Sequence, residues 1–422
     1  MIKQYVKQAV QMLKENRLIS IISIAGTAIS IAMIMVVVLV FQIQFASFYP
    51  ENDRDRMMYV DSGTEVRSND GWNRGNMSPE AVKECFYSLK LPEAVSGYAS
   101  QAKPLSIPGK RMYKAYDIKY TDPGFWKIFS FRFVAGKPFT QADFDSAIPQ
   151  AVVSTSIAKH LYGTADVVGK PVIIDLATYT ICGVVEDVSR AADTAYGNVW
   201  VPYTSDRILM SNVYSENMSG SLSVCLLAKD SHDFDAIRQE LLGQTARYNG
   251  TKKDAQINFF ENPITRFDVA IGSIGQRKVK LKDYLMETGG LLLFLLLVPA
   301  LNLLGVTQSS VQKRRSEMGV RKAFGATFGV LVRQVLYENC VITLLGGVLG
   351  LALSLSFLPL CKDFMLKDSE TLLSGDMIFQ PAIFLLALLF SLLINLLSAG
   401  IPAVQVARQQ IVTSLKDGED NR

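Results

Sequence analysis

Side chains that carry out catalysis or hold metals are sparse in this sequence. Its 422 residues contain two histidines, His160 and His232, and five cysteines without C-x-x-C or zinc-type spacing. Neither the hydrolase motif G-x-S-x-G nor the zinc-protease motif H-E-x-x-H occurs. The sequence therefore predicts no catalytic residue, no metal site and no enzymatic activity in this chain, and it places His160 on a helix surface without a role.

One stretch, GTADVVGKP at 163–171, has the glycines and lysine of a phosphate-binding loop. Such a loop separates its two glycines by four residues and follows the lysine with a Ser or Thr that binds Mg²⁺. Here five residues separate Gly163 from Gly169, and Pro171 follows the lysine. We therefore expect no nucleotide site and no cofactor in this chain.

The cysteines leave one question open. Three of the five lie in the long central part of the chain, where a single disulfide is one alternative and free thiols are the other. The five are Cys85, Cys182, Cys225, Cys340 and Cys361.

Apolar runs dominate the two ends of the chain. Residues 18–41 are 24 consecutive uncharged residues, more than the roughly 20 that a helix needs to cross a bilayer. This run is also too long for the apolar part of a cleaved signal peptide, so we expect an anchor that is retained. Three further apolar segments follow, and the predicted membrane helices are 18–41, 288–311, 330–360 and 379–403.

Basic residues at the ends of these runs predict the orientation. Lysines and arginines cluster before the first run and after the second, which places both regions in the cytoplasm. With four spans, both ends of the chain are then cytoplasmic and the long central segment is outside. The predicted non-spanning parts are an amphipathic N-terminal helix at 1–17, an outer domain with stalk segments at 42–287, cytoplasmic 312–329, a short outer loop at 361–378 and a cytoplasmic tail at 404–422.

The central segment reads as a folded mixed α/β domain. The stretch at 111–120 alternates like a strand, and Asp-Pro-Gly at 122–124 marks a turn. Residues 151–163 predict a strand running into a helix, with Ser154 or Ser156 as its N-cap. Residues 171–188 predict two strands.

The segment KRRSEMGVRKAFGAT at 313–327 carries five basic residues and one acid between two apolar runs. It fits a helix from about 312 to 324, because Glu317 and Arg321 are four residues apart and Gly325 suits a C-terminal stop. Charge alone leaves open a simple contact with lipid head groups.

This charged segment also contains the pattern R-x-E-x-G-x-R-K-A-x-G-A-T at Arg315–Thr327, which resembles the cytoplasmic loop of FtsX/MacB-type ABC transporter permeases. The last stretch, LLSAGIPAVQVARQQIVTSLKDGE at 396–419, resembles the end of the same family. Residues 122–144, 151–188 and 199–205 resemble its MacB-like periplasmic core domain. The tail departs from the family at 409–411, where a proline is usual. The resemblance covers essentially the whole chain.

The resemblance implies mechanotransmission. In this family, two permeases pair with two ATPases, and ATP-driven motion passes through the membrane helices to the periplasmic domain. No ATPase domain accompanies this sequence, so the resemblance implies that ATP is used by a separate cytoplasmic ABC ATPase. The helix at 312–324 is then its docking handle, with a basic rim and apolar contacts. The implied coupling residues are Arg314, Arg315, Glu317, Met318, Val320, Arg321, Lys322, Phe324 and Gly325.

Other segments suggest how helices pack and move. Gly26 with Ser30, and Gly346 with Gly350, have the spacing that allows close helix approach, either within one protomer or at a dimer seam. The N-terminal helix fits a membrane surface or the ATPase. Residues 42–50 and 272–287 are candidates for a stalk that carries movement outward, as the family's does.

We therefore expect an inner-membrane protein with four helices and a large α/β periplasmic domain. The favoured function is a permease subunit, in a homodimer or heterodimer, that drives export or extraction of a peptide, antibiotic or lipid-linked molecule with a periplasmic adaptor. The alternative is an FtsX-like regulator that activates a cell-wall hydrolase without transport. Nucleic acid is not an expected partner.

Overall fold

The computed structural model describes part of the chain. The described residues are 17–67, 72–109, 114–214, 218–260, 262–271, 280–287, 289–290, 320, 324–365, 385–386, 388–390, 392–393 and 396. They belong to two compact units, a helical unit and an α/β unit made by Gln44–Tyr284. The predicted N-terminal amphipathic helix and cytoplasmic tail lie outside the described residues, as does nearly all of the predicted second span.

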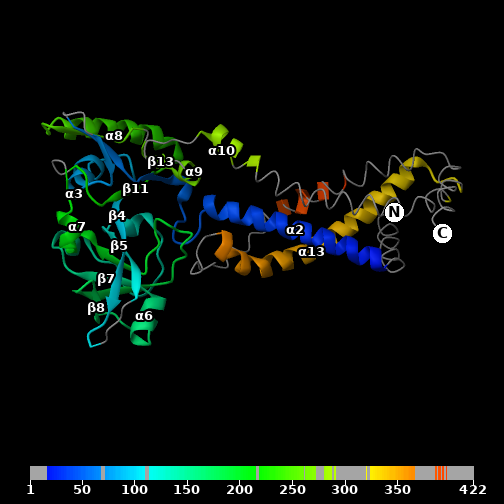
Figure 1. Cartoon of the computed structure of the whole chain (residues 1–422), viewed down its shortest axis with the longest axis horizontal. Coiled ribbons are helices and arrows are strands. Elements are labelled where there is room, and N and C mark those ends of the chain that lie inside the picture. The colour runs from blue at the N-terminus through cyan, green and yellow to red at the C-terminus, as the bar shows by residue number, and fades with distance from the viewer. Residues whose placement is uncertain are drawn as a thin grey trace. The chain divides into compact units, whose positions relative to one another are not determined.

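The helical unit contains two long helices, α2 (Arg17–Phe45) and α13 (Phe328–Met365) (Figure 1). Among the described residues, none of the helices combines the length and apolar character that crossing a membrane requires. The four-span topology therefore stays a sequence-based prediction.

The exposure pattern of α2 and α13 differs from that of a soluble helix. Thr27 and Thr343 are buried, whereas Ile21 is 65% exposed and Val348 is 66% exposed. A helix that faces water places its polar residues outward and its apolar residues inward. These two helices instead present many aliphatic side chains outward, and they bury small polar side chains beside the apolar cluster of Ile31, Ile34 and Met35.

One mixed sheet forms the centre of the α/β unit. Ten described strands pair in the order β13-β1-β11-β4-β5-β10-β7-β9-β6, with β8 between β4 and β9 (Figure 1). Most neighbours are antiparallel, and β10 with β5 and β7 with β9 are parallel. The strands are β1 (Met57–Val60), β4 (Ala94–Ser106), β5 (Ala115–Thr121), β6 (Phe133–Gly136), β7 (Gln150–Ser154), β8 (Pro171–Ile174), β9 (Ala177–Val185), β10 (Val199–Pro202), β11 (Ser223–Leu227) and β13 (Ile264–Thr265).

A smaller sheet and several helices complete this unit. The small sheet has the order β12-β2-β3, with β2 at Gly63–Arg67, β3 at Trp72–Gly75 and β12 at Ala255–Asn258. The helical segments are η1 (Arg54–Arg56), α3 (Pro79–Ala81), η2 (Val82–Phe86), α4 (Phe125–Ile128), α5 (Gln141–Asp145), α6 (Thr155–Tyr162), η3 (Tyr203–Ser205), α7 (Arg207–Ser211), η4 (Ser231–Asp233), α8 (Phe234–Asn249) and α9 (Arg266–Ala270), and α10 (Leu281–Glu287) follows. Aromatic contacts link the parts, as where the rings of Phe86 and Phe259 lie 4.9 Å apart.

The structure confirms that the central segment is a mixed α/β domain, and it does so at particular residues. Ser154 ends β7 and caps α6 by accepting a hydrogen bond from the amide of Ile157. Gly163 ends α6 with a φ of 75°, and His160 is exposed on that helix. The two strands predicted within 171–188 are β8 and β9, which form a hairpin that ends at Val185. Cys85, Cys182 and Cys225 are free, so the disulfide alternative does not apply to this unit.

Candidate functional site

Three members of the predicted coupling segment lie among the described residues: Val320, Phe324 and Gly325. The amide of Phe324 donates to the carbonyl of Val320 over 3.1 Å, which is the spacing of an α-helical turn. Gly325 follows with a φ of 90°, a conformation that ends a helix without steric cost to glycine. The other six coupling residues, Arg314, Arg315, Glu317, Met318, Arg321 and Lys322, lie outside the described residues.

Phe324 is an unusual surface residue at the end of this turn. Its side chain is 89% exposed, and Val320, one turn earlier, is 43% exposed. An exposed aromatic ring on a helix, beside charged residues, is typical of an anchor that fills a pocket in a partner protein. The described part of the segment is therefore a turn with exposed apolar side chains, and its role in docking stays a prediction.

Gly346 and Gly350, one of the predicted small-residue pairs, lie against α2. A Cβ at Gly350 would lie 2.8 Å from the carbonyl oxygen of Ala28 and 3.0 Å from the Cβ of Ile31. A Cβ at Gly346 would lie 2.7 Å from the Cγ2 of Thr27. These contacts lie within one protomer. Ser30 is 2% exposed on the same stretch of α2, and Gly26 is partly buried nearby.

A buried ion pair lies where the chain passes from α2 into the α/β unit. Arg54 donates through Nε to Glu51 Oε2 over 2.6 Å, and both side chains have 0% exposure. The second carboxylate oxygen of Glu51 accepts from the amide of Ala195 over 2.9 Å. The guanidinium also lies over the ring of Phe48, 3.9 Å from its centroid. Sequence reasoning missed this group.

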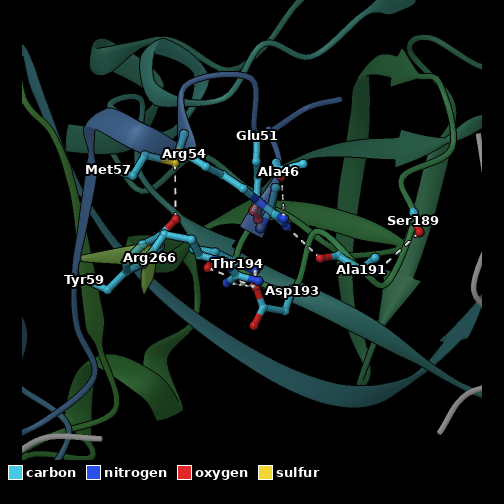
Figure 2. Close-up of polar contacts among 11 residues, drawn as sticks. Ala46, Glu51, Arg54, Met57, Tyr59, Ser189, Ala191, Asp193, Thr194 and Arg266 are labelled. Atoms are coloured by element: carbon cyan, nitrogen blue, oxygen red, sulfur yellow. Dashed lines mark hydrogen bonds and ion pairs between the residues drawn. The ribbon is translucent and has the colours of Figure 1, made fainter. Parts of the chain in front are cut away.

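A second ion pair lies where the chain leaves the sheet at α9. Arg266 donates through Nη1 to Asp193 Oδ1 over 3.0 Å. Tyr59 on β1 lies to one side of the two pairs and donates its hydroxyl to Met57 Sδ over 3.4 Å (Figure 2), and burial, followed by the charge of Glu51, raises the pKa of this hydroxyl well above the ordinary value. Both ion pairs thus involve the loop between β9 and β10, because Glu51 accepts from the amide of Ala195 and Arg266 pairs with Asp193.

Lys119 is the buried amine of this region. It is 2% exposed on β5, and its Nζ lies 3.4 Å from the carbonyl oxygen of Asp193 and 5.1 Å from the centroid of the Tyr98 ring. Burial lowers the pKa of Lys119 to about 8, although the nearby carboxylates of Asp193 and Glu51 oppose that shift. The group titrates close to neutral pH for a structural reason, because its ammonium is poorly solvated.

Burial also changes the titration of two thiols in the α/β unit. Burial raises the pKa of the Cys85 and Cys182 thiols to about 12, so almost no thiolate nucleophile exists at neutral pH. His232 is exposed and contacts Asp230 on the surface. Within the described ranges, His, Cys, Asp and Glu side chains do not gather in threes that could hold a metal ion.

No local pattern marks the two ion pairs. Arg54 lies in the polar stretch ENDRDR, which reads as an exposed turn, and its bond to the Ala191 carbonyl joins residues 137 positions apart. The partner of Glu51 at Ala195 is 144 positions away. The weak signal available was the placement of ENDRDR directly after a predicted membrane helix.

Comparison with known proteins assigns both parts of the chain. Residues 20–244 match the family described as MacB-like periplasmic core domain, and residues 289–411 match the FtsX-like permease C-terminal family. The chain is 22% identical over 422 residues to the uncharacterized ABC transporter permease YknZ of Bacillus subtilis, covering 97% of this chain and 98% of that protein. It is 23% identical over 416 residues to the macrolide export ATP-binding/permease protein MacB of Escherichia coli K12, covering 96% of this chain and 59% of that protein.

Among solved structures, the periplasmic region of MacB from Actinobacillus actinomycetemcomitans is similar at 17% identity with a TM-score of 0.35. That match covers 49% of this chain and 92% of the solved one. The chain thus spans nearly all of YknZ but little more than half of the MacB protein of Escherichia coli.

Proposed function

The chain belongs to the ABC transporter permeases that carry a MacB-like periplasmic core domain and an FtsX-like C-terminal region, and we propose that it couples a separate ATPase to movement of that domain. Members of this family are inner-membrane permeases with a periplasmic domain. In the proposed cycle, a cytoplasmic ABC ATPase binds and hydrolyses ATP, and the α/β unit changes position in response. The chain itself performs no chemical step.

The exposed ring of Phe324 is the observation that carries this proposal. A phenylalanine that is 89% exposed loses favourable burial unless a partner covers it, because each apolar Å² removed from water contributes about 25 cal/mol. The helix stop at Gly325 places this ring at the end of a turn, where a groove on another protein has access to it. A cytoplasmic ATPase is the partner that family membership suggests.

The outward-facing aliphatic side chains of α2 and α13 support a membrane location. Ile21, Ile29 and Val348 are each more than half exposed, while serines and threonines lie between the helices. That arrangement suits helices surrounded by lipid, where close packing of small residues replaces the hydrophobic effect as the source of helix association.

The proposed cargo is an envelope substrate such as a peptide, an antibiotic or a lipid-linked molecule. Relatives named for macrolide export and for pyoverdine export suggest this class, and those names describe the relatives alone. We propose a dimer, with a second copy or a related permease, and a periplasmic adaptor as a further partner. Activation of a cell-wall hydrolase by the same motion is the competing function.

The experiment reconstitutes the full chain in lipid nanodiscs with an ABC ATPase encoded by a neighbouring gene. Hydrogen exchange in the α/β unit is measured with and without ATP, for wild type, Phe324→Asp and the control Phe324→Tyr. We expect ATP to change exchange in wild type and in the tyrosine control. Phe324→Asp should insert normally and lose at least about tenfold in ATPase affinity.

Two results would contradict the proposal. One is that hydrogen exchange in the wild-type α/β unit does not change with ATP. The other is that Phe324→Asp binds the ATPase as well as wild type does. Mass spectrometry of molecules retained by the complex then separates the two functions. A co-purifying small molecule favours transport, and stimulation of an added cell-wall hydrolase favours regulation.

A further inference from the structure

One segment leads the chain into the α/β unit, and another leads it out of the sheet. Both segments contact the same loop. The incoming segment follows α2 and runs from Phe45 to η1, and the outgoing segment is α9. The loop joins the end of β9 at Val185 to the start of β10 at Val199. Ion pairs from both segments reach this loop.

Arg54 fixes the incoming segment from three directions (Figure 2). Its Nε donates to Glu51, its Nη1 donates to the carbonyl of Ala46 over 2.9 Å, and its Nη2 donates to the carbonyl of Ala191 over 2.7 Å. The guanidinium is planar and presents its donors as a rigid fork, so these bonds set both the position and the angle of the segment. Lysine offers no equivalent geometry.

The outgoing segment is held to the same loop and to the incoming one. Arg266 pairs with Asp193, and the rings of Phe45 and Phe267 lie 5.9 Å apart. Strand β13, directly before α9, pairs with β1, directly after η1. The incoming and outgoing segments therefore contact each other, and each of them also contacts the loop.

The loop is in turn attached to the middle of the sheet. The Trp200 indole Nε1 donates to the carbonyl of Ala195 over 3.1 Å, and the Trp200 side chain is fully buried. Trp200 lies on β10, which pairs with both β5 and β7. A displacement of the loop is thus passed directly to central strands.

We propose that Glu51, Arg54, Asp193 and Arg266, named here the base clamp, are positioning residues that make both connections of the α/β unit move with its sheet as one body. This inference rests on the proposed function, because it says how motion from the membrane helices reaches the sheet. The buried ion pair fits such a role. Apolar residues of similar size often stabilise a protein as well as a buried ion pair does, so we assign this pair the role of fixing the geometry.

The first test compares Arg54→Met with the double variant Glu51→Leu/Arg54→Met in the nanodisc complex with the ATPase. The double variant removes both charges and leaves neither buried alone, so the unit should fold as in wild type. Lys103→Met is the matched control, because it breaks the Lys103–Asp175 ion pair, which involves neither connection nor the loop.

Hydrogen exchange provides two readouts. Exchange of β7 and β10 without nucleotide reports folding, and the ATP-dependent difference in the same strands reports transmission. In the double variant we expect normal exchange without nucleotide and an ATP-dependent difference that falls about tenfold. The difference at α10 should persist, because α10 lies before the clamp on the path from the membrane helices. The Lys103→Met complex should resemble wild type.

A folded double variant that keeps the full ATP-dependent difference in β7 and β10 would overturn the clamp. The proposed function fails in a different way, because the wild-type complex then shows no ATP-dependent difference at any strand. The two failures are therefore distinguishable in one data set.

The second test locks the two connections together. Phe45→Cys/Phe267→Cys, treated with a short cleavable bifunctional maleimide, should cross-link and keep the wild-type ATP-dependent difference, since the clamp already makes the segments move as one. The wild-type complex treated with the same reagent is the control. Loss of transmission that returns on cleaving the linker, or failure of the two cysteines to cross-link, would contradict the inference.

Discussion

At the scale of single residues, Arg54 and Glu51 are the most consequential charges of the α/β unit. Both side chains are fully buried, and each has further partners in backbone groups of distant segments. Leaving one member of a buried pair alone costs about 3–5 kcal/mol, whereas replacing both by apolar residues is often neutral. The pair therefore predicts unequal effects for single and double substitutions.

We expect Arg54→Met to lower the free energy of unfolding of the α/β unit by about 3–5 kcal/mol, and Glu51→Leu/Arg54→Met to recover most of that loss. Denaturant unfolding of the full chain, followed by tryptophan fluorescence, measures this. Trp72, Trp126 and Trp200 are the three tryptophans of the chain and all lie in this unit. A double variant as unstable as the single one would show that the hydrogen bonds to the backbone, rather than the unpaired charge, dominate.

Lys119 predicts a pH dependence with a definite sign. Its pKa falls from 10.5 to about 8 on folding, so the folded unit favours the neutral amine. The charged form then costs about 3 kcal/mol of stability below pH 8, and that cost disappears as the pH rises from about 8 to 10.5. Lys119→Met should stabilise the unit at pH 7 and lose its advantage above pH 10.

The same tryptophan-detected unfolding, repeated between pH 7 and 10.5, checks this prediction across the titration range of Lys119. Lys119→Arg is the control, because an arginine stays charged throughout and should remain destabilising. If Lys119→Met raises the free energy of unfolding by the same amount at every pH, the cause is packing rather than charge.

At the scale of elements, the packing of α13 on α2 depends on which atom each glycine faces. A Cβ at Gly350 would lie 2.8 Å from the backbone carbonyl oxygen of Ala28, and a Cβ at Gly346 would lie 2.8 Å from the Cβ of Thr27; neither of these atoms can rotate away. We therefore expect Gly350→Ala and Gly346→Ala each to destabilise the helix pair by about 1–3 kcal/mol.

Gly329→Ala on the same helix is the control, because its added Cβ would approach nothing closer than the Arg333 guanidinium at 3.9 Å. The temperature at which each full-length variant aggregates in nanodiscs ranks the stabilities of the variants. An alanine at 346 or 350 that costs no more than the alanine at 329 would contradict this account of the interface.

The β8–β9 hairpin has a turn built from unfavourable residues. Asp175 and Leu176 have φ values of 46° and 73°, and Leu176 is 96% exposed. A left-handed conformation costs a residue with a Cβ about 1–2 kcal/mol, and glycine avoids that cost. Leu176→Gly should therefore stabilise the α/β unit by about 1 kcal/mol in tryptophan-detected unfolding. A decrease would indicate that the leucine side chain makes a stabilising contact.

At the scale of the whole molecule, the predicted topology places Leu176 and Phe324 on opposite sides of the membrane. Both side chains are exposed, so single cysteines there should react readily with a maleimide. We expect a membrane-impermeant maleimide to label Leu176→Cys in intact cells and Phe324→Cys after permeabilisation. The wild-type chain is the control for its own thiols, of which Cys85 and Cys225 are buried. Labelling of both variants in intact cells would refute the four-span arrangement.

Several elements of the fold could be predicted from short stretches of sequence. The β7–α6 unit followed from an apolar strand, a serine N-cap and Gly163, which are all contiguous. The β8–β9 hairpin followed from two β-rich runs. The strand order could not be predicted, because β1 pairs with β11 and β13, which are far from it in the sequence. Such pairings depend on which surfaces can be buried together.

The sequence by itself determined the family, the mixed α/β class of the central segment, the apolar ends and the basic charge of the segment at 313–327, because each rests on contiguous residues or on local periodicity. Only the tertiary structure decided that Gly350 packs on Ala28 within one protomer and that Arg54 and Arg266 meet a single loop. The physical reason is that a buried charge must find its partners wherever the folded chain brings them. Those partners lie far away in sequence, where no local pattern records them.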